Sequence, residues 1–314
     1  MDSSSKACIS ESLELTCLSW NMEGFRRNHM SLRHFCDVYQ PDLIFISEPQ
    51  VFQCDFRLFS KPFSHQYSFL LNSEENKYPE LALDKSRAHG GTLVMWKSKL
   101  DPYVTPLPTS SPAFLPILLN IPGYGPSIHV AIYLPTSGRD PEFVDALSLI
   151  DNFLEEASSV HKCPIYIRGD ANCNPKNLPR SNLLQHFLLK HGLVSLDFNH
   201  PSHHHFTGQG LYDSQLDVLL YQVSSPPEIL RSIVCKLNHP LVDSAHDVVL
   251  SLCPLTAHTD NTTDSSENIE AIKVSNERIK ILWDEESSPD YQSLVSDTLT
   301  TPPYLTALGM CPSL

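Results

Sequence analysis

Residues 164–172 read PIYIRGDAN, and the predicted fold and site both depend on this stretch. Its apolar first half has the composition of a buried β-strand. The turn that follows projects two short acceptor side chains, those of Asp170 and Asn172. An Asn or Asp after a strand usually only forms a turn. Whether Asp170 and Asn172 form a functional site therefore depends on which residues lie at the ends of the other predicted strands.

The same pattern, a polar side chain where an apolar run starts or stops, recurs along the chain. The residues concerned are Asn21 and Glu23 in LSWNMEG (18–24), Glu48 in ISEPQ (46–50), Tyr133 in HVAIYLP (129–135), Asp217 in DSQLDVLLY (213–221) and His246 in VDSAHDVVLSL (242–252). Strands that end together gather distant residues at one edge of a sheet sandwich. We therefore expect these side chains to converge.

Glu48 has a clear chemical meaning, since it follows the nearly continuous apolar run DLIFIS (42–47). A carboxylate beside apolar neighbours needs a partner, and Mg²⁺ prefers oxygen ligands of this kind. The alternative is a solvated strand end. His246, with an Asp on a neighbouring strand, is a candidate acid/base pair because imidazole changes its charge near neutral pH.

Strand patterns outnumber helix patterns in this sequence. Helices are predicted at 31–39, from Asp140 to about Leu154, and at 182–191, with Asp140 as an N-cap and Gly192 as the stop of the third. A doubly wound parallel fold would need more helices between its strands. We therefore expect an α/β fold, a four-layered sandwich of two packed, mostly antiparallel β-sheets flanked by helices. The strands are expected at 13–20, 42–47, 66–71, 91–97, 114–120, 128–134, 164–168, 215–221, 231–237 and 247–253.

The 314 residues, of which 41% are apolar, are enough for one large domain with extensions. We expect a flexible N-terminal tail at 1–12, the domain at 13–256, and an acidic linker with a short helical tail at 257–314. Residues 255–314 carry 10 Asp and Glu against 3 Lys and Arg, which is half of the net charge of −14. Such an acidic chain disfavours sequence-blind nucleic-acid binding over a broad surface, but it is compatible with a local basic groove.

The cellular compartment and the binding partners are predicted from sequence patterns that are absent. The nine Cys include no C-x-x-C pair, which favours a reducing compartment over a disulfide scaffold. No run approaches the roughly 20 apolar residues of a membrane span, and the Ser-rich start lacks a signal-peptide core. We expect an intracellular protein of the nucleus or cytoplasm, with no membrane association and no obligate protein partner.

Seven segments, taken in order, resemble the endonuclease/exonuclease/phosphatase superfamily. They are LSWNMEG (18–24), ISEPQ (46–50), HGGTLVMWK (89–97), HVAIYLPTSGRD (129–140), IRGDANCNP (167–175), DSQLDVLLY (213–221) and DSAHD (243–247). Within the superfamily they are most similar to the apurinic-type endonuclease domain at the start of LINE-type (non-LTR) retrotransposon polyproteins. The resemblance covers about residues 13–255. Residues 283–299 resemble the segment that links such domains to a reverse transcriptase.

The resemblance implies an Mg²⁺-dependent phosphodiesterase, with Mn²⁺ as an alternative ion, that binds DNA and nicks one strand. Glu48 would be the principal Mg²⁺ ligand, with Asn21 and Glu23 nearby in the metal and phosphate shell. The expected substrate contacts are Arg139, Asn174 and Ser214.

For the cleavage step the resemblance implies roles for the remaining strand-end residues. Asp170 would orient or deprotonate the attacking water, while Asn172 and Tyr133 would hold the scissile phosphate. His246 would contact that phosphate, with Asp217 fixing its tautomer. Together they meet the needs of phosphodiester cleavage, an activated water and neutralised phosphate oxygens.

Two positions depart from the family pattern. Glu23 stands where the family usually has Asp, so its reach differs by one methylene group. The family's last motif is typically Ser-Asp-His, whereas here Ala245 precedes His246 and can neither ligate a metal nor accept a side-chain hydrogen bond. Asp247 is adjacent, but in an extended strand it would point to the opposite face. We expect weaker metal binding or a locally rearranged site.

Two other functions stay open on the sequence. The same residues could act on a phosphoinositide, a sphingolipid or a small phosphodiester, because they act on the shared phosphate. Alternatively, the chain is an impaired nuclease remnant that serves as a binding module. The run His203-His204-His205 lacks the spacing of a metal site and is interpreted as structural. The resemblance implies instead that this segment flanks the substrate groove. A serine hydrolase using Ser214 would lack the G-x-S-x-G elbow.

Overall fold

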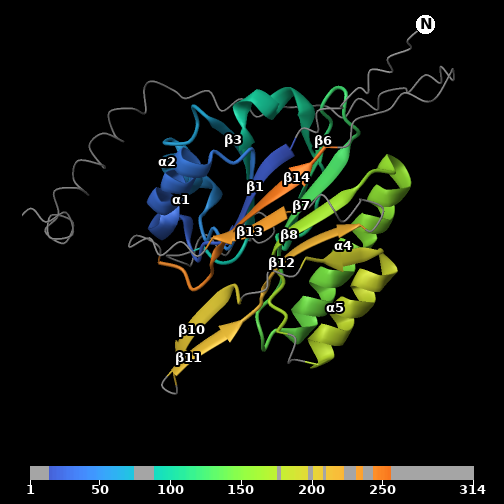
Figure 1. Cartoon of the computed structure of the whole chain (residues 1–314). Helices are drawn as coiled ribbons and strands as arrows, with labels where there is room; N and C mark the ends of the chain where they lie inside the picture. The colour runs from blue at the N-terminus through green and yellow to red at the C-terminus, as the bar shows by residue number, and fades with distance from the viewer. Residues whose placement is uncertain are drawn as a thin grey trace, which may run out of the picture. The chain divides into compact units, whose positions relative to one another are not determined.

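The structure, a computed structural model, describes residues 14–73, 88–174, 178–196, 201–207, 210–222, 231–235 and 243–255. These residues form two β-sheets of six strands each and a separate two-stranded hairpin. The sheets lie face to face, with helices on their outer sides (Figure 1). The predicted tails at 1–12 and 257–314, with the domain boundaries that they imply, lie outside the described residues and stay predictions.

The first sheet has the strand order β13-β14-β1-β2-β4-β3. β1 and β2 are parallel, and the other neighbours in this order are antiparallel. Helices α1 (Phe25–Tyr39) and α2 (Gln53–Ser60) share an apolar cluster with its outer face. The strands are β1 (Glu14–Asn21), β2 (Leu43–Ser47), β3 (Tyr67–Asn72), β4 (Thr92–Lys97), β13 (Arg231–Cys235) and β14 (Val248–Pro254).

The second sheet has the order β5-β6-β7-β8-β12-β9, in which β7 and β8 are the parallel pair. Helices α4 (Asp140–His161) and α5 (Leu178–Lys190) pack on its outer face. The predicted four-layered, mostly antiparallel sandwich is therefore confirmed. The remaining elements are β5 (Val104–Pro106), β6 (Phe114–Leu119), β7 (Ser127–Tyr133), β8 (Ile165–Asp170), β9 (Leu193–Ser195), β12 (Asp217–Gln222), the hairpin strands β10 (His203–Thr207) and β11 (Gly210–Ser214), and a 3₁₀ helix, η2 (Ser98–Tyr103).

The apolar run of β2 follows from its position between two apolar layers. Leu43 and Phe45 face the cluster between the sheets, while Ile44 and Ile46 face the cluster under α1 and α2. Because side chains alternate between the two faces of a strand, a strand covered on both faces needs apolar residues at every position.

The helices differ from expectation mainly at their ends. α1 begins at Phe25, earlier than the predicted start at residue 31. Phe25 is buried, but the polar residues that follow it hide the apolar pattern of the first turns. The prediction that Asp140 caps α4 is wrong, since the helix begins at Asp140 and no side chain caps it. The Asp140 carboxylate instead accepts a hydrogen bond from Arg180 Nε at 2.6 Å. None of the helices in the described ranges is long and apolar enough to cross a membrane.

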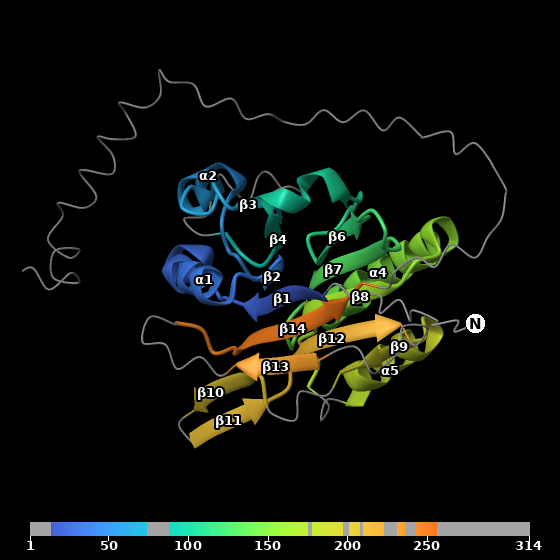
Figure 2. The same cartoon turned by 45° about the horizontal axis from the view of Figure 1, so that its top comes forward.

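Five short features escape the sequence prediction: α2, η2, β5, β9 and the β10–β11 hairpin. The hairpin projects away from the two sheets (Figure 2). Residues 203–205 of the hairpin are three consecutive His, so apolar and polar positions do not alternate there. Tertiary contacts rather than local pattern decide these elements.

The two sheets touch where β2 and β8 end. Ser47 Oγ donates to the carbonyl of Ile132 at 2.8 Å and accepts the backbone N–H of Asp170 at 3.2 Å. Gly169, whose φ is 137°, leaves room for this contact: a Cβ there would lie 2.9 Å from Ser47 Oγ and only 2.0 Å from the Ile132 oxygen of the neighbouring strand β7. The contact brings the strand end of the first sheet against that of the second.

Candidate active site

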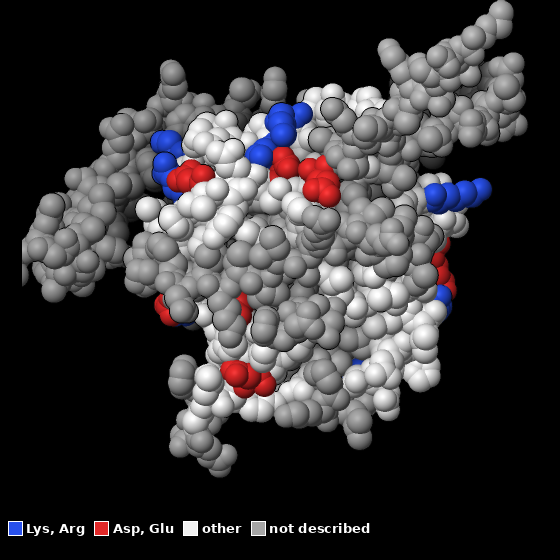
Figure 3. Space-filling view, viewed as in Figure 1, with Lys and Arg blue, Asp and Glu red and all other residues white. Residues whose placement is uncertain are grey.

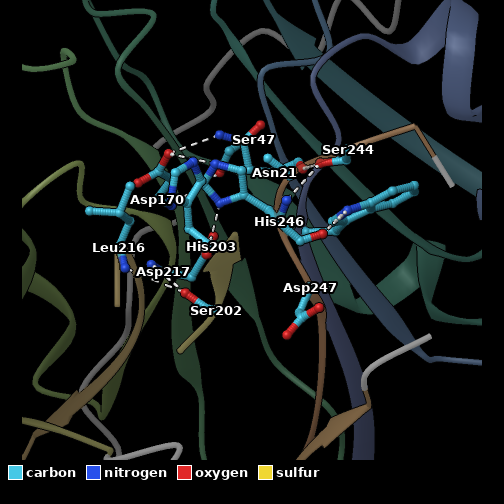
Figure 4. Close-up of polar contacts among 12 residues, drawn as sticks. Asn21, Ser47, Asp170, Ser202, His203, Leu216, Asp217, Ser244, His246 and Asp247 are labelled. Carbon is cyan, nitrogen blue, oxygen red and sulfur yellow. Dashed lines mark hydrogen bonds and ion pairs between the residues drawn. The ribbon is translucent and has the colours of Figure 1, made fainter. Parts of the chain in front are cut away.

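A buried group of two carboxylates and one imidazole forms where β8, β12 and the segment before β14 meet (Figure 4). Asp217 Oδ2 lies 2.9 Å from His246 Nδ1. The other ring nitrogen, Nε2, lies 3.9 Å from Asp170 Oδ2. Asp170 and Asp217 face each other across the antiparallel pair β8–β12. The structure thus brings together three of the predicted catalytic residues.

Asp217 makes the His246 ring a cation at neutral pH. Burial alone lowers the pKa of His246, but the charge of Asp217 and its hydrogen bond outweigh burial and raise that pKa to about 9. Trp20 Nε1 donates to the His246 carbonyl at 3.1 Å, which holds the backbone of this residue in place. The site therefore contains a positively charged imidazole that is held in a fixed position between Asp217 and Asp170.

Asp170 is held by neighbours on both oxygens. Its Oδ2 accepts from Asn21 Nδ2 at 2.8 Å, and its Oδ1 accepts the backbone N–H of Asn172 at 2.7 Å. Burial raises the pKa of Asp170 to about 7, although the positive His246 opposes this rise. A carboxylate whose pKa lies near the working pH can accept a proton from water.

Asn172 and Tyr133 flank Asp170. Tyr133 ends β7 and is the partner of Asp170 in the parallel pair β7–β8. Asn172 has a left-handed backbone, with φ of 46°, and its Nδ2 donates to the carbonyl of Leu134 at 2.8 Å. The two loops that carry the predicted phosphate contacts are thus bonded to each other.

Arg180 of α5 holds these two loops from behind. Its guanidinium donates to the carbonyls of Pro135 and Thr136 at 2.7 Å, and to that of Asn172 at 3.2 Å. The side chain is buried and stacks over Phe143, with 4.5 Å from Cζ to the ring centroid. Arg180 is therefore fully occupied by these contacts and is unavailable to bind a phosphate.

Arg180→Lys is expected to lower the free energy of unfolding by about 2 kcal/mol, because a single ammonium group cannot satisfy three carbonyls and Asp140 at once. Urea denaturation measures the change. Arg139→Lys is the matched control, since the exposed Arg139 makes one contact, at 3.4 Å with Glu142. That change should stay within about 0.5 kcal/mol. Equal effects of the two substitutions would contradict the role given to Arg180.

The predicted metal residues do not form a protein cage. Within the described ranges no three His, Cys, Asp or Glu side chains gather as a metal site. Mg²⁺ does not need one, since it is commonly held by one or two carboxylates together with water and substrate phosphate. Glu48 fits this chemistry: it follows β2 with φ of 49°, and its Oε2 accepts from Gln50 Nε2 at 2.7 Å. Asn21 is less suited, because its side-chain oxygen accepts the N–H of Glu23.

Glu23 shows how the chain rearranges around Ala245. Its carboxylate Oε2 accepts the backbone N–H of Ala245 at 2.9 Å, a contact that fixes the segment before His246. Asp247 does turn away from the site, as predicted, and its Oδ2 lies 3.1 Å from His204 Nε2. Glu23 therefore contacts the backbone of residue 245, the position at which the family pattern has a carboxylate side chain.

A second imidazole, that of His203, lies beside the site although it was not among the predicted site residues. Its ring centroid lies 4.7 Å from that of His246, and its Nδ1 lies 3.0 Å from Ser214 Oγ. Burial and the nearby positive His246 lower the pKa of His203, so this second imidazole is neutral. The His run thus lies beside the candidate site, where the resemblance placed it, and the interpretation as structural is incomplete. The available signal was that His203 and His205 share one face of a strand.

Further hydrogen bonds fasten the hairpin to the site. Ser202 Oγ accepts the N–H of Asp217 at 3.2 Å, and the N–H of His204 donates to the Ala245 carbonyl at 2.8 Å. Ser214 contacts His203 rather than His246, so the Ser-His-Asp arrangement of a serine hydrolase is not formed.

The other two expected substrate contacts lie farther from His246. Asn174 Nδ2 donates to the hydroxyl of Tyr212 on the hairpin. Arg139 is exposed at the start of α4 and pairs with Glu142. Neither contributes to the buried group around Asp170.

The architecture and the strand-end site can be compared with known proteins. No protein-family profile and no curated protein sequence matches the chain. Solved structures do match. The endonuclease domain of TRAS1, a telomere-specific non-LTR retrotransposon, superposes with a TM-score of 0.57 at 15% identity over 76% of this chain and 97% of that domain. The chain has the endonuclease/exonuclease/phosphatase fold.

Other structures of the endonuclease/exonuclease/phosphatase fold are equally similar. The AP endonuclease LMAP from Leishmania major has a TM-score of 0.57 at 15% identity, over 78% of this chain and 88% of that one. The human Nocturnin catalytic domain has a TM-score of 0.55 at 14% identity, over 77% and 95%. At these identities the likeness establishes the fold, and the chemistry has to be argued from the site.

Proposed function

We propose that this chain is an Mg²⁺-dependent phosphodiesterase that nicks one strand of DNA. The observation that carries the proposal is the pair formed by Asp170, whose pKa lies near 7, and the positively charged His246, with 3.9 Å between their facing side-chain atoms. One group accepts a proton and the other neutralises an anion, and both stand at the same sheet edge. Phosphodiester hydrolysis requires this combination.

In the proposed reaction Asp170 takes a proton from water as the water oxygen attacks phosphorus. The bond from phosphorus to the 3′ oxygen breaks, and His246 stabilises the developing charge and protonates the leaving oxygen. Asn172 and Tyr133 hold the phosphate, while Asp217 keeps the imidazole charged and oriented. When bound, held by Glu48 with Glu23 nearby, Mg²⁺ supplies further neutralisation of the phosphate oxygens.

DNA as the substrate is supported by the relatives of the fold, among them NExo, a Neisseria 3′ phosphatase whose structure contains a product DNA hairpin. The charge distribution indicates how DNA would be held. On the face shown in Figure 3 the charged residues are scattered and most of the described surface is uncharged. We therefore propose a short contact at the nick site, inside the cell, rather than an extended electrostatic footprint.

Plasmid nicking tests the proposal. Supercoiled DNA should convert to the open circular form with Mg²⁺ and stay intact with EDTA. Asp170→Asn should slow nicking at least about a hundredfold through loss of the proton acceptor. Glu48→Gln should raise the Mg²⁺ concentration needed at least about tenfold. Asp37→Asn, which neutralises an exposed carboxylate of α1, is the control. Unchanged nicking in Asp170→Asn would refute the assigned chemistry.

Ala245 favours one second function, a binding module built on an impaired nuclease. In that case the chain would bind the same DNA without nicking it at any Mg²⁺ or Mn²⁺ concentration. Fluorescence anisotropy with a labelled duplex, run beside the nicking assay, separates the two functions.

A further inference from the structure

A cavity of about 160 Å³ opens beside the candidate active site, between the end of β7 and the first turns of α4. Two of its lining residues connect it to that site. Tyr133 is the strand partner of Asp170, and the carbonyl of Gly91 accepts the backbone N–H of Glu48 at 3.2 Å. The cavity therefore borders both strand ends on which the proposed chemistry rests.

The charges of the cavity do not suit a phosphate. Glu142 and Asp145 of α4 supply two carboxylates against the single guanidinium of Arg139, which already pairs with Glu142 at 3.4 Å. A phosphate would be repelled by this excess of negative charge. An uncharged ring that carries N–H donors would instead find acceptors.

Asp145 is the acceptor best placed to take such a donor. It is exposed at the cavity rim and has no hydrogen bond or ion pair with any other described residue. The remaining wall is apolar, with Pro112, Ala146 and Leu149. An apolar wall with few polar groups is typical of a ligand site, and this volume is well below the roughly 300 Å³ at which drug-sized ligands begin. One planar ring is the matching size.

We propose that this cavity holds an unstacked nucleobase next to the scissile phosphate, with Asp145 accepting a hydrogen bond from the exocyclic amino group of that base. The proposal rests on the proposed function, since the phosphate at Asp170 places the neighbouring base. Carboxylates read amino groups on base edges, and a well-made pair of contacts discriminates strongly against the wrong base. Guanine, cytosine and adenine carry such an amino group. The N–H donor on the base-pairing edge of thymine, N3–H, lies between two carbonyl oxygens, which the carboxylate of Asp145 would repel. The nick site should therefore exclude thymine at this flanking position.

A binding experiment tests the cavity without requiring cleavage. Saturation-transfer NMR in metal-free buffer compares the four deoxynucleosides, of which the three with amino groups should bind and thymidine should bind at least about fivefold more weakly. Asp145→Ala should remove the difference. Glu156→Ala, another exposed carboxylate of α4 far from the cavity, should keep it. Ala146→Leu, which fills the cavity, should abolish binding, with a thermal melt to show that it folds. Equal binding of thymidine, or binding that survives Ala146→Leu, overturns the proposal.

Nick mapping then tests the position of the base. On a duplex library randomised around the nick, thymine should be depleted at least about fivefold at one flanking position, and Asp145→Ala should lose that depletion. Nicking without any flanking preference overturns the inference and leaves the proposed function standing. Selective nucleoside binding with no nicking of any duplex overturns the proposed function and leaves the cavity assignment standing.

Discussion

Replacing Gly169 by Ala is expected to prevent the chain from folding. The residue has φ of 137°, and an added Cβ would lie 2.0 Å from the Ile132 carbonyl oxygen and 2.9 Å from Ser47 Oγ. The backbone cannot yield, because β7 and β8 pair in register on both sides of this point. We expect a loss above about 5 kcal/mol, comparable with the total stability of many domains. Soluble yield and a urea unfolding transition measure it.

Gly138→Ala is the matched control. Gly138 also has positive φ, 87°, but a Cβ there meets no atom within 4 Å. Only the backbone preference is lost, which costs about 1 kcal/mol, so this variant should fold and unfold cooperatively. A Gly169→Ala protein as stable as Gly138→Ala would show that β8 does not lie as close to β7 and to Ser47 as described.

The pH dependence of nicking should have an alkaline limb near pH 9. Below that value His246 is charged, since Asp217 raises its pKa to about 9. Above it the positive charge that meets the phosphate disappears. Asp217→Asn should lower the rate at least about a hundredfold. It should also move this limb to lower pH by at least about one unit, because burial lowers the pKa of His246 and the charge of Asp217 no longer counteracts it. A rate profile from pH 6 to 10 measures both effects.

Stability provides an independent check of the same pair. The folded-state pKa of His246 lies above its ordinary value of 6.5, so its stabilising contribution is complete below about pH 6.5 and is lost as the pH rises through about 9.

Asp151→Asn is the control for the nicking experiment, because Asp151 also contacts a buried imidazole, His191, at 2.7 Å but lies away from the site. It should leave the alkaline limb of nicking in place. A limb that does not move in Asp217→Asn would contradict the role of this pair.

Much of the fold and part of the site could be predicted because the signals are local. The period-two apolar pattern of strands and the apolar run of β2 follow from burial on one or both faces, and they identify the sandwich. The strand ends also predict that Asp170, Asp217 and His246 lie at one edge. Local signals also identified α4, through Pro141 and its apolar stripe, although not its true first residue.

Side-chain partners could not be predicted, because they join residues far apart in the chain. The contact between Glu23 and Ala245 joins residues 222 positions apart. The hydrogen bond from Arg180 to Pro135, in the loop after β7, joins residues 45 positions apart. His203 reaches His246 only because the hairpin is bonded to the last strand segment.

The sequence by itself thus determined where most strands lie and which polar residues end them, since alternation and apolar runs are properties of neighbouring residues. Tertiary structure alone decided which atoms meet there. The clearest case is Gly169, which reads as an ordinary turn glycine until the Ile132 carbonyl and Ser47 are seen against it. Close packing between two sheets depends on contacts of a few tenths of an ångström, and no one-dimensional pattern encodes those distances.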